Sequence, residues 1–196
     1  MDKFLIMFEN LKKYNIILGS NSPRRKELLT DIGLKFSTKK IDCEENYPES
    51  LQSCDVPIYL AKKKANSYHL KGNDLLITAD TVVSLDNEIL GKPSDYDEAV
   101  KMLKKLSGKF HYVYSGVCIK TLEKEILFGS ETKVKFVELD NDIIENYVKT
   151  YEPYDKAGAY GIQEWIGKVG VESIDGSFYN VMGLPVCKLI NELRKV

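Results

Sequence analysis

The chain has 196 residues, of which 43% are hydrophobic and 29% charged, and its formal net charge is -1. This length suits one sizeable core, or one core with a subsidiary lobe, rather than two independent domains. A nearly neutral charge excludes a general attraction to nucleic acid or to an anionic membrane, so we expect neither as a partner. Any bound anion must be held by local basic residues.

Neither the cysteines nor the N-terminal segment carries a metal or targeting signal. The cysteines show no Cys-x-x-Cys pair and no histidine at metal-ligand spacing, which favours reduced thiols and a cytoplasmic location. They are Cys43, Cys54, Cys118 and Cys187. The apolar run at 4–8 is too short for a membrane span and lacks a basic start. Apolar residues at helical spacing predict a short helix over 2–14 that packs on the body.

Strands and helices alternate in the first half of the chain. Apolar periodicity, capping residues and glycines set the expected bounds, including Gly33 as the end of the first of these helices and Ser94 as a cap. The expected elements are a strand at 16–18, a helix over 23–31, a strand near 35–41, a helix from Asp55 to about 69, strands at 75–78 and 82–83, a turn at 86–87, and a helix over 95–106.

The second half is richer in strand-forming residues. The expected elements are long strands at 112–121 and 126–136, a helix from Asp140 to about 149, short strands around 175–176, and a C-terminal helix that begins at 184–185. Strands and helices that alternate in the first half, followed by a β-meander in the second, predict an α/β fold with a mixed sheet. We expect the ligand at strand ends, in a crevice between the two halves.

Residues 16–25, Ile-Ile-Leu-Gly-Ser-Asn-Ser-Pro-Arg-Arg, join a buried strand to a helix start. Ser22 is a helix cap and Pro23 suits the first turn, so free helical N–H groups point into the loop. Arg24 and Arg25 beside this positive dipole end favour a bound phosphate or carboxylate. An ordinary capped helix with two solvated arginines is an equally good interpretation of this segment alone.

Two further motifs have the composition of a phosphate and metal site. Asp80 follows a buried strand, where a carboxylate can hold Mg²⁺ or take a proton from water, although turn aspartates also cap backbone. Lys92, between a glycine and a proline, is suited to meet a phosphate reproducibly. A solvated turn lysine is the alternative for this position.

Residues 152–163 mix charge, small residues, aromatic rings and an amide. Small residues allow close backbone approach, and Tyr160 or Gln163 is suited to pack against a nucleobase or to bond its edge. A tight crossing of two elements would need similar residues. Glu45 and Lys64 join the candidates only if the fold brings them to the site.

Several standard chemistries are excluded by the residues present. There is no Gly-x-x-x-x-Gly-Lys-Ser/Thr loop, and the segment 19–23 ends in proline where a nucleophile elbow needs glycine. The two histidines, His69 and His111, lie near no acidic motif, which argues against a histidine triad or a zinc site. The candidates that remain are acidic residues, lysines, arginines and a loop suited to hold an anion. This set suits metal-assisted attack of water on phosphorus.

Four motifs together resemble those of the Maf family, in the same order and at similar spacing. They are Ser20–Arg25, Ala79–Val83, Gly91–Pro93 and Asp155–Gln163, and the segment 176–185 is similar to the closing motif of the family. The resemblance covers roughly 15–195 and implies one catalytic domain at 15–196 after an N-terminal extension, 1–14. The implied fold is a mixed twisted sheet with flanking helices and two lobes around a deep cleft, similar to inosine triphosphate pyrophosphatases.

The resemblance also implies a cytoplasmic nucleoside triphosphate pyrophosphatase, often a homodimer, that releases a nucleoside monophosphate and pyrophosphate. It implies a divalent metal ion, Mg²⁺ first, with Mn²⁺ or Co²⁺ as alternatives. Asp80 matches the catalytic position, and Glu45 with Asp80 matches the metal-binding ones. The positions expected to bind substrate are Ser20, Ser22, Arg24, Arg25, Lys64, Thr81, Lys92, Lys156 and Gln163.

Arg24, Thr81 and Gln163 match positions that the family associates with dTTP and UTP, whereas Arg25 stays open between phosphate binding and structure. Two other functions remain open: a nucleotide-binding regulator of cell division without turnover, and a pyrophosphatase for modified or other non-standard nucleotides. The chain departs from the family pattern in its extension and at Glu164–Ile166.

Overall fold

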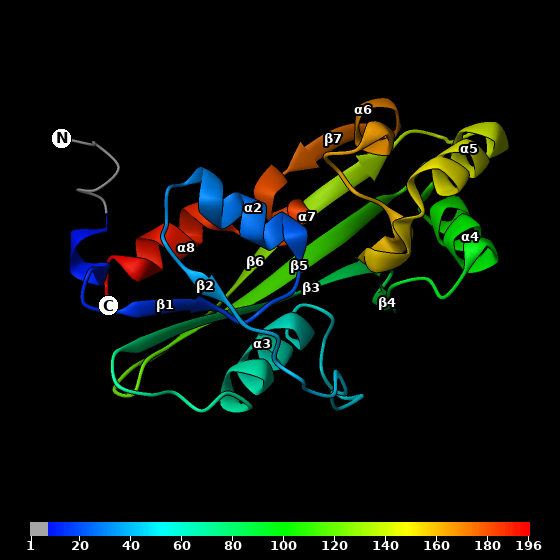
Figure 1. Cartoon of the computed structure of the whole chain (residues 1–196). Helices are drawn as coiled ribbons and strands as arrows, with labels where there is room; N and C mark the ends of the chain where they lie inside the picture. Colours follow the sequence, from blue (N-terminus) through cyan, green and yellow to red (C-terminus); the bar gives the residue numbers. More distant parts are fainter. Residues whose placement is uncertain (1–7) are drawn as a thin grey trace.

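The computed structural model describes residues 8–196, and these residues form a mixed seven-stranded sheet with helices around it (Figure 1). The strands are β1 (Asn15–Leu18), β2 (Ser37–Thr38), β3 (Asp74–Leu85), β4 (Glu88–Leu90), β5 (Phe110–Lys120), β6 (Glu125–Phe136) and β7 (Val171–Asp175). Their order is β2-β1-β3-β5-β6-β7, with β4 paired to β3. β1 runs parallel to β2 and β3, and the remaining pairs are antiparallel.

Helices cover both faces of the sheet and gather at one end. The α-helices are α2 (Pro23–Asp31), α3 (Val56–Asn66), α4 (Tyr96–Leu106), α5 (Asn141–Tyr151), α6 (Trp165–Gly170), α7 (Phe178–Met182) and α8 (Val186–Leu193). Three 3-10 helices, η1 (Glu9–Leu11), η2 (Pro153–Asp155) and η3 (Ala157–Ala159), complete the described part. In Figure 1, α3 lies on one face, α2 and α8 on the other, and α4, α5 and α6 at the far end. The predicted α/β class with a mixed sheet is confirmed.

β3 is the central strand of the site, and the structure corrects its predicted division at residues 79–81. All of its residues but one are buried, which is typical of a strand covered on both faces. Polar side chains inside it find partners: Thr78 Oγ1 donates to the Ala61 carbonyl at 2.6 Å, and Thr81 Oγ1 lies 2.8 Å from Ser115 Oγ. The pairing of β3 with β5 is also unbroken from Leu76 to Ser84, so the strand continues through Asp80 without a turn.

The predicted N-terminal helix is wrong for the described residues. Residues 2–7 of that prediction lie outside the described part of the chain, and the rest forms only η1 before β1 begins. Leu11 is 2% exposed, and Asn10 Nδ2 donates to the Leu193 carbonyl at 2.9 Å, so η1 does pack against α8. The division into an extension and one catalytic domain stays a prediction.

Other element bounds differ in ways that have local causes. The strand predicted near 35–41 is only the short β2, because only two of its residues pair with β1. α3 ends at Asn66 rather than near 69, and the Asp55 side chain makes no capping bond to it. The cap of α4 is Asp95, not Ser94, since Asp95 Oδ1 accepts from the N–H of Glu98 at 2.9 Å. α6 and α7 were not predicted.

Within 8–196, no helix combines the length and apolar character needed to cross a membrane.

Candidate active site

A cleft of about 740 Å³ opens between the β1–α2 loop, β3 with α3, and the segment 155–163. All of the residues predicted from the sequence to form the site line this cleft. They are Ser20, Ser22, Arg24, Arg25, Glu45, Lys64, Asp80, Thr81, Lys92, Lys156 and Gln163. The fold thus gathers side chains that are far apart in the sequence, while their individual roles stay predictions.

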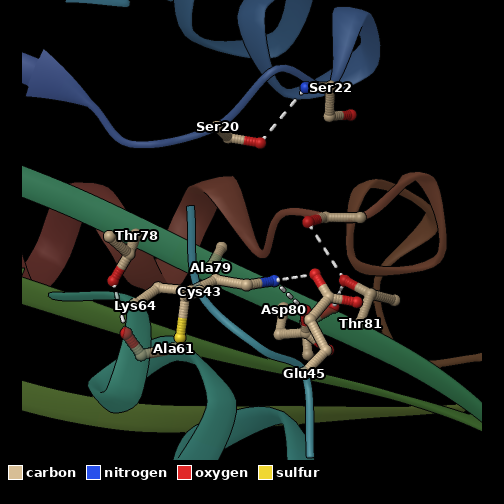
Figure 2. Close-up of polar contacts among 12 residues, drawn as sticks. Ser20, Ser22, Cys43, Glu45, Ala61, Lys64, Thr78, Ala79, Asp80 and Thr81 are labelled. Atoms are coloured by element: carbon tan, nitrogen blue, oxygen red, sulfur yellow. Dashed lines mark hydrogen bonds and ion pairs between the residues drawn. The ribbon is translucent and has the colours of Figure 1, made fainter. Parts of the chain in front are cut away.

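The β1–α2 loop forms one wall of the cleft, and hydrogen bonds within the loop fix its shape. Ser22 Oγ accepts the N–H of Arg25 at 3.4 Å as the cap of α2. Ser20 Oγ accepts the N–H of Ser22 at 3.2 Å (Figure 2). Gly19 precedes this loop, and a Cβ there would lie 2.4 Å from Ile41 Cδ1 and 2.8 Å from Thr78 Cγ2, so its backbone packs closely against these side chains. The start of α2 therefore points its positive dipole end into the cleft.

The two arginines of α2 point in different directions. Arg25 turns inward, where its Nη1 donates to the Ala79 carbonyl and its Nε to the Gly183 carbonyl, each at 2.8 Å. Burial lowers the pKa of Arg25 from its usual value, although Asp80 opposes this shift. Arg25 thus ties α2 to β3 and to the end of α7, which gives it a structural role whether or not it also contacts phosphate.

Arg24 reaches across the cleft instead. Its Nη1 lies 2.6 Å from Asp155 Oδ2, and the same carboxylate bonds Lys156 through Oδ1 at 2.6 Å. Burial raises the pKa of Asp155, but hydrogen bonds from Lys156 and Arg24 outweigh it and hold the net pKa below its usual value. Sequence reasoning missed Asp155 as a bridge, although an acid next to a predicted phosphate-binding lysine is the available signal.

An acidic pair meets one ammonium on the opposite wall. Lys64 Nζ from α3 lies 2.5 Å from Asp80 Oδ1 and 2.7 Å from Glu45 Oε1, as Figure 2 shows. The Lys64 and Asp80 side chains are each only 12% exposed. Burial raises the pKa of Glu45, but Lys64, together with Lys92 and Arg25, outweighs burial and holds the net pKa below the usual value. Both carboxylates therefore point at one cationic centre.

This donor set fits a hard divalent cation. Carboxylate oxygens are the ligands that Mg²⁺ and Mn²⁺ prefer, and Asp80 and Glu45 already converge on a single positive charge. Among the described residues, no group of three or more acids, histidines or cysteines is placed to hold a metal ion. A metal at this pair would complete its coordination with water and phosphate oxygens, as Mg²⁺ commonly does.

The two remaining lysines line the cleft from other parts of the chain, Lys92 after β4 and Lys156 between η2 and η3. Lys92 is exposed in the turn after β4. Lys156 is buried, and its Nζ lies 3.1 Å from Glu164 Oε1 in addition to its bond with Asp155. One lysine is therefore open to solvent and the other is held by two carboxylates.

The far end of the cleft has the features of a nucleobase pocket. The side-chain oxygen of Gln163 is buried and has no hydrogen-bond partner among the described residues. Tyr160 also lines the cleft and is buried, with its hydroxyl 2.7 Å from His111 Nε2. Burial lowers the pKa of His111 to about 4, so its ring is neutral near pH 7. An unpaired amide in a cleft is suited to read a base edge.

Together, the sheet topology and the cleft define an α/β protein whose cleft gathers basic side chains beside an acidic pair. The family described as Maf-like protein matches residues 15–196 of the sequence. Since this match spans most of the sequence, the chain belongs to the Maf family.

Close relatives carry one functional name. The chain is 51% identical over 193 residues to the dTTP/UTP pyrophosphatase of Phocaeicola vulgatus, an alignment that covers 97% of this chain and 100% of that protein. It is 52% identical to the dTTP/UTP pyrophosphatase of Porphyromonas gingivalis, with 96% and 97% covered. The protein of the same name from Cytophaga hutchinsonii is 49% identical, with 97% and 88% covered.

A solved structure supports the fold. A HAM1 protein from Coxiella burnetii superposes with a TM-score of 0.51 over 93% of this chain and 100% of that one, at 14% sequence identity. At that identity the likeness concerns the fold alone.

Proposed function

We propose that this chain is a dTTP/UTP pyrophosphatase, which hydrolyses the bond between the α- and β-phosphates to give a nucleoside monophosphate and pyrophosphate. One observation supports this most strongly: Asp80 and Glu45 converge on Lys64 in the same cleft as the capped start of α2. The names and identities of the relatives support the substrate class.

Each wall of the cleft has its own task in this proposal. The start of α2, with Ser20, Ser22 and Arg24, binds phosphate oxygens through N–H, hydroxyl and guanidinium donors. The lysines Lys64, Lys92 and Lys156 balance further charge around the triphosphate. Asp80 orients a water molecule and accepts its proton as the water attacks phosphorus.

A divalent ion, Mg²⁺ in this proposal, would be held by Asp80 and Glu45 and would neutralise phosphate charge when bound. Mn²⁺ and Co²⁺ are alternatives for the same donors. The proposal also includes a homodimer, from the family resemblance, and a cytoplasmic location, which the four free cysteines support.

Base selectivity is expected to come from Gln163. We expect pyrophosphate release from dTTP and UTP to be at least about tenfold more efficient, in kcat/KM, than from ATP or GTP, because a buried amide pairs with one pattern of base donors and acceptors only. Gln163→Ala should remove most of this difference. The measurement is pyrophosphate release from a panel of natural and modified triphosphates with Mg²⁺ or Mn²⁺.

The matched control is Gln52→Ala, which removes an exposed amide outside this cleft and should keep the wild-type preference. Equal rates on purine and pyrimidine triphosphates would contradict the selectivity argument. Faster release from modified triphosphates would favour a role in clearing non-standard nucleotides. Tight binding of nucleotides without any pyrophosphate release would instead favour the regulator of cell division.

A further inference from the structure

Glu164 directly follows the cleft-lining segment 155–163 and has an unexpected set of contacts. It stands at the N-cap position of α6, yet its side chain makes no capping bond to that helix. Its carboxylate instead accepts a hydrogen bond from Tyr147 Oη through Oε2, and its Oε1 lies 3.1 Å from Lys156 Nζ. The carboxylate is thus turned from its own helix toward a cleft-lining lysine.

Tyr147 fixes this carboxylate from α5. Its side chain is fully buried, and its hydroxyl accepts the N–H of Gly161 at 3.0 Å while it donates to Glu164. Burial raises the pKa of Tyr147, and the bond with Glu164 raises it further, so the hydroxyl stays protonated and remains a donor. The direction of both hydrogen bonds is therefore fixed: Gly161 donates to Tyr147, and Tyr147 donates to Glu164.

The backbone is shaped to admit the Glu164 side chain. A Cβ on Gly161 would lie 2.7 Å from Glu164 Cδ and 2.9 Å from its Oε2, so the carboxylate packs directly against a residue that has no side chain. Gly161 lines the cleft between Lys156 and Gln163. Glu164 thus contacts Lys156 and also the backbone at Gly161, in the segment that leads to Gln163.

The second partner of Lys156 is less suited to hold it. Asp155 is 55% exposed and shares its carboxylate with Arg24, whereas the Glu164 side chain is 20% exposed and is bonded to buried Tyr147. An incoming triphosphate competes with Asp155 for both cations. Glu164 is the partner that can remain while phosphate binds, because its other oxygen is held by the protein interior.

We propose that Glu164, held by Tyr147, is a positioning residue that fixes the ammonium of Lys156 for triphosphate binding. The inference rests on the proposed function and deepens it, because it assigns a task to a position outside the family motifs. Glu164 acts only through Lys156 in this arrangement and touches neither substrate nor metal.

The test is a double-mutant cycle of Glu164→Gln and Lys156→Met, read as KM and kcat for dTTP. In the Glu164→Gln variant the new amide oxygen can still accept from Tyr147, but the ion pair with Lys156 is lost. We expect this variant to raise KM about tenfold, with a smaller change in kcat, as for loss of one charged hydrogen bond. In the Lys156→Met background, the same change should have almost no further effect.

Two more variants keep the test decisive. Tyr147→Phe removes only the hydroxyl and should raise KM in the same direction, again only when Lys156 is present. Glu145→Gln is the matched control, because it breaks an exposed pair with Lys149 on the same helix as Tyr147 and should leave KM unchanged. Thermal unfolding of each variant identifies any that fail to fold.

If Glu164→Gln changes KM equally with and without Lys156, the inference is overturned, because the effects of residues that act independently add. The same cycle is measured as the Kd of dTTP, by calorimetry, in an Asp80→Asn background. A wild type that releases no pyrophosphate would refute the proposed function, while the Kd cycle would still decide whether Glu164 acts through Lys156.

Discussion

Asp80→Asn is expected to lower kcat for pyrophosphate release from dTTP by about 10³-fold, because removal of a general base typically costs roughly 10² to 10⁴. The asparagine has the same shape and can still accept a hydrogen bond from Lys64, which now bonds Asp80 at 2.5 Å. It cannot accept a proton from water, however, and it is a poorer ligand for a divalent cation. The measurement is steady-state pyrophosphate release by the full chain.

Asp74→Asn provides the matched control for this variant. Asp74 begins the same strand, is buried, and accepts the N–H of Lys71 through Oδ2 at 3.0 Å, but it lies outside the cleft. We expect it to keep nearly the wild-type kcat, because an amide oxygen accepts the same bond. A normally folded Asp80→Asn variant with full activity would refute the catalytic assignment.

Gly116→Ala is expected to lower the free energy of unfolding by about 3 kcal/mol, the upper end of the usual cost of overpacking. A Cβ on this residue of β5 would lie 2.2 Å from the Ile58 nitrogen and 2.3 Å from the Pro57 carbonyl oxygen. Those atoms belong to the backbone of α3, so no side-chain rotation can relieve the clash. The helix must move away from the sheet.

The displacement should also reduce activity, because α3 carries Lys64 and its contact with Asp80. Urea unfolding measures the change in stability, and pyrophosphate release measures the change in activity. Gly91→Ala is the stability control, because a Cβ there meets no atom within 4 Å. A Gly116→Ala protein with wild-type stability would show that α3 does not pack on β5 as described.

Features encoded by local sequence were predictable. Ser22 and Pro23 identify the start of α2 without reference to the rest of the fold, and the hairpin turn at Asp86 and Asn87 has the positive φ values that these residues tolerate. Apolar periodicity likewise predicts the C-terminal helix, whose inward side chains Leu189 and Leu193 are fully buried.

Features that depend on distant partners were not predictable in the same way. The hydroxyls of β3 beside Asp80 find their partners in the Ala61 carbonyl of α3 and the Ser115 hydroxyl of β5, which no local pattern reveals. The inward turn of Arg25 depends on the carbonyl of Gly183, a residue separated from it by most of the chain. Periodicity and capping rules contain no information about such contacts.

In the candidate site, too, some features could be predicted from local sequence and others depend on distant partners. Its residues could be identified from motif composition and family resemblance, and the structure places all of them in one cleft. The bridge through Asp155 joins α2 to η2, and the turn of Glu164 toward Lys156 depends on Tyr147 from α5, so both appear only in three dimensions. Sequence motifs therefore identified the groups expected to contact the ligand but not the groups that orient them.

The products formed from dTTP and UTP test the central proposal most directly. The purified full chain is incubated with each nucleotide and Mg²⁺, and the products are identified by phosphorus NMR. We expect nucleoside monophosphate and pyrophosphate in equal amounts, with neither nucleoside diphosphate nor orthophosphate. Formation of dTDP or UDP with orthophosphate, or no turnover of either nucleotide, would contradict the proposal.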